Sequence, residues 1–95
     1  MDNAKVQELY EKMLQVHERG QDCFSQDNVP SMLKNEYKNK VSQYDEMYEN
    51  IEMMKGITTN PETIDNLLNQ QHEILTVRIK WELGWIKKVL GHISK

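Results

Sequence analysis

The sequence has little cysteine, proline and glycine, and each shortage narrows the class of protein. Cys23 is the single cysteine, which excludes a disulfide within the chain and a cluster of cysteine metal ligands. Two prolines and four glycines among 95 residues leave few positions that interrupt a helix. A lone cysteine is typical of a reducing compartment, so we expect a cytoplasmic protein.

Long apolar runs are also missing. No run approaches the roughly 18 residues of a membrane span, and the first residues lack the basic-then-apolar order of a secretory signal. We therefore expect neither membrane insertion nor secretion. Charged residues make up 28% of the chain and hydrophobic residues 38%, which is typical of a helical domain with a charged surface. The charge is uneven, because residues 78–95 carry +4 and residues 1–77 carry −7.

Motifs of catalytic and metal sites are absent. The Glu-x-x-His spacing of di-iron bundles fails because an apolar residue or an amide stands three positions before each histidine. No phosphate-binding loop or nucleophile elbow occurs. We predict no catalytic, cofactor-binding or metal-binding residues, and a protein that is not an enzyme. An enzyme or metal protein that uses His17, His72 or Glu82 is kept as a third hypothesis, although His17 is interpreted first as a core-edge residue with one hydrogen bond.

Hydrophobic periodicity predicts three helices. The third, over residues 61–93, has the clearest start, because Thr59 or Asn60 can cap its free N–H groups and Pro61 suits its first turn. The first helix is expected over residues 2–20, with Asp2 or Asn3 as its cap.

Two boundaries depend on turn-forming residues. Gly20 is expected to end the first helix, and residues 21–30, which include Cys23 and Phe24, are expected to form a loop. The second helix is expected over residues 29–55, with Asp27 or Asn28 as a cap ahead of Pro30.

These elements predict an all-α fold: one domain over residues 1–95, built as an antiparallel three-helix bundle with a long C-terminal helix. The apolar positions of that helix cover an arc of about 200°, twice the usual width, so it should contact partners on two sides. It should also overhang the other helices. The overhang either breaks near Gly84 into a short fourth helix or packs against a second copy or another protein.

The C-terminal segment carries both tryptophans and most of the basic charge. It is expected to complete the core of the chain, to bind a second copy or a partner protein, or to lie on a membrane surface. Arg78 and Glu82, spaced i,i+4, form either an ion pair at the rim or a buried pair that fixes register. The candidate interface residues are Arg78, Trp81, Glu82, Trp85, Ile86, Val89 and Leu90, with Tyr44 and Tyr48 of the second helix as secondary candidates.

These features favour a small non-enzymatic module that binds and modulates, and in one form inhibits, a larger cytoplasmic protein. It would need no cofactor, and it would act as a monomer or a homodimer. Frequent asparagine, lysine and isoleucine suggest an AT-rich bacterial, phage or plasmid genome. Nucleic acid is not an expected partner, because the basic end holds few cations and the acidic body repels phosphates.

The alternative is a membrane-surface-associated immunity or regulatory protein that acts through the basic C-terminal helix. In length and helical character the chain resembles bacteriocin immunity proteins, which are small cytoplasmic bundles. That resemblance concerns architecture and not a sequence motif.

Overall fold

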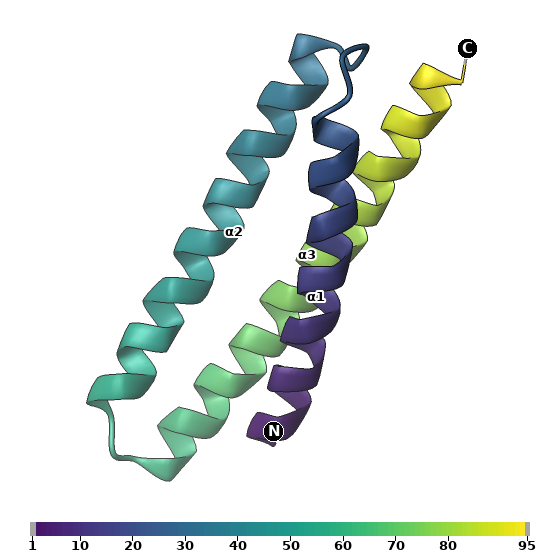
Figure 1. Cartoon of the computed structure of the whole chain (residues 1–95). Coiled ribbons are helices and arrows are strands. Elements are labelled where there is room, and N and C mark those ends of the chain that lie inside the picture. The colour runs from purple at the N-terminus through teal and green to yellow at the C-terminus, as the bar shows by residue number, and fades with distance from the viewer. Residues whose placement is uncertain (1, 95) are drawn as a thin grey trace.

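The computed structural model describes residues 2–94, and within this range the chain has three helices and no strand (Figure 1). The all-α fold with three helices and a long C-terminal helix is therefore confirmed. None of the described helices is both long enough and apolar enough to cross a membrane. The helices are α1 (Asn3–Phe24), α2 (Ser31–Ile57) and α3 (Pro61–Ile93).

Helix α3 is the element on which the other two rest. Both α1 and α2 pack closely against it, whereas the backbones of α1 and α2 approach each other at few points and the two helices meet through side chains such as Tyr10 and Tyr48, whose ring centroids are 5.2 Å apart. Figure 1 shows α2 running opposite to α3 and joined to it by a short connection, while α1 follows the same direction as α3. The described part of the chain is elongated, with extents of 53 × 20 × 15 Å, and α3 spans about 50 Å of that length at 1.5 Å per residue.

The C-terminal half of α3 does not break. The helix is continuous through Gly84 to Ile93, so the short fourth helix considered from the sequence is not formed. The end of α3 is covered in part by the beginning of α2, because Leu33 accepts a hydrogen bond from the Trp85 indole at 3.0 Å. Val29, in the connection before α2, is buried in the same core.

Helix α1 continues four residues beyond Gly20, so the expected stop at this glycine was wrong. Gly20 has no positive φ; it is buried, and a Cβ built on it would lie 2.5 Å from the Tyr37 hydroxyl oxygen. The glycine therefore allows a tyrosine of α2 to approach the α1 backbone. As a consequence Cys23 and Phe24, which were expected in a loop, belong to the last turn of α1.

The helix starts follow local rules at two of three places. The Asn60 side chain accepts a hydrogen bond from the Glu62 amide at 2.9 Å, and Asp2 caps α1 in the same way. The start of α2 differs from the prediction. Pro30 occupies the cap position before Ser31 and no side chain caps the helix, so the expected Asp or Asn cap is absent.

An aromatic cluster built on Tyr37 joins α1, α2 and α3. The ring of Tyr37 has centroid distances of 4.3 Å to Trp85, 6.1 Å to Trp81 and 5.6 Å to Phe24. Tyr37 is 1% exposed and Trp85 is 2% exposed. Large rings buried in offset contact contribute strongly to a small core, so this cluster anchors one half of the bundle.

Alanine substitutions at Gly84 and Gly20 test the close approach of Tyr37 to α1. Gly84→Ala should raise the free energy of unfolding by up to about 1 kcal/mol, because nothing lies within 4 Å of the new Cβ and alanine favours a helix. Gly20→Ala should lower it by about 1–3 kcal/mol, because the Tyr37 ring must move. Urea unfolding followed by circular dichroism measures both. A Gly20→Ala protein as stable as Gly84→Ala would contradict the close approach.

Candidate functional site

A buried ion pair lies near the middle of α3. The side chains of Arg78 and Glu82 are 4% and 0% exposed, and Arg78 Nε donates a hydrogen bond to Glu82 Oε1 at 3.3 Å. Arg78 Nη1 also donates to Oδ1 of Asp45, on α2, at 2.6 Å. Of the two interpretations given to this pair from the sequence, the structure shows the buried one.

The imidazole of His17 brings α1 into the same network. Its Nδ1 lies 3.1 Å from Glu82 Oε1, 3.1 Å from the Tyr37 hydroxyl oxygen and 3.4 Å from Arg78 Nη2. A protonated Nδ1 donates to the carboxylate, whereas an unprotonated Nδ1 accepts from Tyr37 or Arg78. His17 was expected to have one hydrogen bond at the core edge. It instead meets polar groups of both other helices.

The network is dominated by the cost of burying the Glu82 carboxylate. Oε1 of Glu82 faces both Arg78 and His17, but Oε2 has no hydrogen-bond partner among the described residues. Burial, followed by the charge of Glu82, raises the pKa of Tyr37 to about 12. Tyr37 therefore stays protonated at neutral pH and keeps its hydrogen available for a bond.

A second polar cluster joins α2 and α3 nearer the connection between them. Gln71 is fully buried, and its Nε2 donates to Glu52 Oε1 at 2.6 Å. Lys55 Nζ donates to Gln71 Oε1 and to Glu52 Oε1, each at 3.0 Å. These hydrogen bonds from Gln71 and Lys55 lower the pKa of Glu52. The cluster holds α2 against α3 but does not reach α1.

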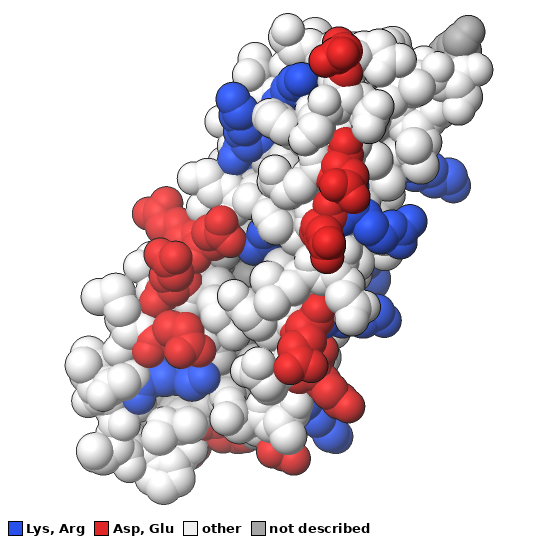
Figure 2. Space-filling model, in the orientation of Figure 1, with Lys and Arg blue, Asp and Glu red and all other residues white. Residues whose placement is uncertain are grey.

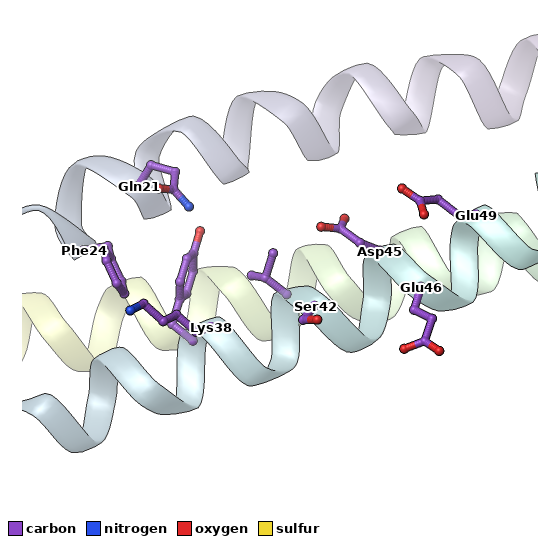
Figure 3. A pocket seen from close by; sticks show the side chains of 9 residues that line it. Gln21, Phe24, Lys38, Ser42, Asp45, Glu46 and Glu49 are labelled. Carbon is purple, nitrogen blue, oxygen red and sulfur yellow. The ribbon is translucent and has the colours of Figure 1, made fainter.

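A groove opens between α1 and α2 beside the network, and we call it the α1–α2 groove. It encloses about 520 Å³ (Figure 3). Its apolar part comes from Phe24, Tyr37 and Val41, and its charged part comes mainly from carboxylates of α2. Tyr37 and Asp45 belong to both groove and network. The lining residues are Gln21, Phe24, Tyr37, Lys38, Val41, Ser42, Asp45, Glu46 and Glu49.

Most of the predicted interface residues lie inside the single chain. Trp85, Ile86 and Val89 are at most 4% exposed and complete the core, which is one of the readings that the sequence left open. Trp81 is half-buried. Leu90 is 50% exposed, so it is the candidate on α3 that still offers apolar surface.

The secondary candidates on α2 also face inward. Tyr44 is buried and lies 6.4 Å from the Trp81 ring, centroid to centroid. Tyr48 is half-buried beside Tyr10 at 5.2 Å, and burial raises the pKa of Tyr48 to about 12. The roles of both tyrosines are thus explained by packing, and their assignment to an interface stays a prediction.

The groove was missed from the sequence. Exposed carboxylates on one side of a helix usually form only a solvated face, so these residues do not stand out in the sequence. The available signal was the spacing of Asp45 and Glu49 at i,i+4, a like-charge pair that a helix does not favour. For the network the available signal was His17, a titratable side chain on the apolar face of its helix.

Metal and thiol chemistry find no support in the described residues. No group of three or more histidine, cysteine, aspartate or glutamate side chains there could hold a metal ion. Burial and the neighbouring Asp22 raise the pKa of the Cys23 thiol, which disfavours the reactive thiolate.

The ion pair can be tested by a cycle of substitutions. Arg78→Met alone should lower the free energy of unfolding by about 3–5 kcal/mol, because it leaves the Glu82 carboxylate buried without its cation, and Glu82→Met alone leaves the buried guanidinium without this carboxylate. Arg78→Met combined with Glu82→Met should recover most of that loss, since neither charge is then buried. Denaturant unfolding of the two single variants and the double variant measures the coupling. Additive losses would contradict a buried, coupled pair.

Substitution of Trp85 distinguishes packing within one chain from packing between two copies. Trp85→Ala should lower the free energy of unfolding by about 3–5 kcal/mol at any protein concentration, because it removes a buried indole and its hydrogen bond to Leu33. Leu90→Ala, at a half-exposed position of the same helix, should change it by about 1 kcal/mol or less. If the effect of Trp85→Ala vanished on dilution, the tryptophan would act between copies and not within one.

Comparison of the chain with protein-family models, with curated proteins and with solved structures found no match. The features of the chain that bear on function are therefore the groove and the network beside it.

Proposed function

We propose that this chain is a small non-enzymatic module that binds and modulates a larger protein, with the α1–α2 groove as its binding surface. The observation that carries the proposal is the groove itself: about 520 Å³ bounded by two helices, with aromatic and aliphatic side chains beside carboxylates. Binding surfaces commonly combine apolar contact area with a few polar groups that fix orientation. We place the protein in the cytoplasm, in keeping with its single free thiol.

The arrangement of the helices supports a helical partner. Because α1 and α2 approach each other less closely than each approaches α3, the bundle leaves a groove open between them. A helix placed there would contact both walls and complete a four-helix arrangement. Docking an amphipathic helix into such a groove is a common mode of peptide recognition. If the bound helix belongs to the working surface of the partner, binding would also inhibit the partner.

The buried network supports binding because it holds the groove in place. Tyr37 is hydrogen-bonded to His17, and Asp45 is held by Arg78, so two lining residues are fixed from behind. A surface that is ordered before binding loses less conformational entropy when the partner arrives. The network thus supplies rigidity without needing a role in catalysis.

The groove supports binding better than catalysis. Ser42 is its one hydroxyl nucleophile of the serine or threonine type, and no hydrogen bond joins it to a histidine or carboxylate among residues 2–94. An activated serine needs such a base within hydrogen-bond reach. The proposal therefore assigns no catalytic residue.

Fewer features of the chain support a role at a membrane surface. Leu83 and Leu90 are 39% and 50% exposed on α3, close to the exposed cations Lys87 and Lys88. Trp85, however, is enclosed in the core and would not anchor the helix at a lipid interface. Because no tryptophan of this segment is fully exposed, we rank this role second.

Filling the groove tests the proposal. Ser42→Trp places a large ring in the hollow at an exposed position and should abolish capture of the partner from cells that carry the gene. Gln43→Trp adds the same ring one residue farther along α2, outside the lining set, and should leave capture unchanged. The captured protein is then purified and titrated against both variants. Equal binding by both variants would refute the groove as the binding surface.

A further inference from the structure

We infer that the occupant of the α1–α2 groove is a cationic amphipathic helix of the partner protein. Its lysine or arginine side chains would face Asp45 and Glu49, and its apolar side chains would cover Phe24 and Val41. This inference rests on the proposed function and adds the chemistry of the bound helix.

Carboxylates outnumber cations among the residues that line the groove. Asp45, Glu46 and Glu49 line it within little more than one turn of α2, and Lys38 is the one cation among the lining residues. In the described part of the chain, neither Glu46 nor Glu49 forms an ion pair. Like charges at i,i+4 disfavour a helix. Arg78 pairs with Asp45 but not with Glu49, so a cation from outside would relieve the repulsion that remains at Glu49.

Two of the three carboxylates point into the groove. Figure 3 shows Asp45 and Glu49 pointing into the space between α1 and α2, whereas Glu46 points away from it. The Asp45 side chain is 52% exposed although its Oδ1 is held by Arg78 at 2.6 Å. A cation that approaches from the groove therefore meets a carboxylate that is already ordered, which reduces the entropic cost of pairing.

The other end of the groove has the opposite charge. Lys34 Nζ and Lys38 Nζ lie 5.2 Å and 5.6 Å from the centroid of the Phe24 ring. In the orientation of Figure 2, lysine and arginine side chains appear near the upper part of α2 and carboxylates over its middle and lower part, with a further cation below them. Lys38 and Glu49 are eleven residues apart on α2, or about 16 Å. A complementary helix thus carries its cations at one end only.

The walls of the groove favour a helix over an extended peptide. Both walls are helices, and residues 2–94 contain no strand whose edge could pair with an extended backbone. Side chains of a helix can interdigitate with rows of side chains on its neighbours. Two cations one turn apart on the occupant would match the one-turn spacing of Asp45 and Glu49.

A second copy of this chain fits the groove less well. The exposed end of its α3 offers Lys80, Lys87 and Lys88, but Lys88 already lies 3.4 Å from Glu36 of its own chain, and the other two are two turns apart. Lys34 and Lys38 of α2 are one turn apart, but both already lie over the Phe24 ring of their own chain. The charge pattern therefore favours a different protein as the source of the helix.

A panel of designed peptides tests the inference. Each 18-residue helical peptide has a leucine face, placed in a different register across the panel, and two lysines one turn apart near one end. A matched peptide has glutamates in place of the two lysines. Fluorescence anisotropy should show that the best lysine peptide binds at least about tenfold more tightly than its glutamate match, with the difference shrinking at high salt.

Protein variants locate the binding. Glu49→Lys should weaken binding of the lysine peptide about tenfold, whereas Glu73→Lys, which makes the same charge change at an exposed position of α3 outside the groove, should not. Ser42→Trp should abolish binding and Gln43→Trp should not. Circular dichroism confirms that each variant is folded.

Three results would overturn the inference. If both peptides bound equally and Ser42→Trp abolished both, the groove would be a docking surface without a preference for cations, and the proposed function would stand. If no peptide in any register bound, the inference would fail, and capture by the Ser42→Trp and Gln43→Trp proteins would decide the proposed function separately. Concentration-dependent self-association lost in Ser42→Trp would identify the occupant as a second copy.

Discussion

The buried pair of Arg78 and Glu82 is the constraint that the groups around it on all three helices must satisfy. Removing two charges from water is costly, and the cost is offset only where other polar groups complete the pair. His17 of α1 and Asp45 of α2 provide those groups. The pair therefore lies where all three helices meet, and its polar contacts join α1 to α2 in addition to the ring contacts of Tyr10 with Tyr48 and of Phe24 with Tyr37. The α1–α2 groove lies beside this link.

The parts of the fold that the sequence predicted are those governed by local physics. Asn60 and Pro61 set the start of α3 through capping and a fixed φ, and the structure shows both effects. The expectation for Gly20 failed because its preference for helix ends is weak beside a tertiary contact. The glycine is kept inside α1 by the approach of Tyr37, a residue on another helix, and no local pattern records that approach.

The site was less predictable than the fold. The spacing of Arg78 and Glu82 predicts that they can pair, but whether the pair is buried depends on His17, which lies 61 residues before Arg78. The carboxylates of the groove present a similar difficulty. Asp45 and Glu49 look like a solvated helix face until α1 is placed opposite them, and that placement follows from the packing of both helices on α3.

Asp45 belongs to both the network and the groove, so the net charge of the network affects the charge of the groove. Arg78 is the one permanent cation between two carboxylates, Asp45 and Glu82, so with a neutral His17 the three groups keep one net negative charge. Arg78 lies 2.6 Å from Asp45 and 3.3 Å from Glu82, so the two carboxylates share its positive charge and neither is fully compensated. Part of the uncompensated charge thus lies on Asp45, at the groove and beside Glu49. The interaction that holds the three helices together therefore also leaves the groove with a charge that a bound cation would neutralise.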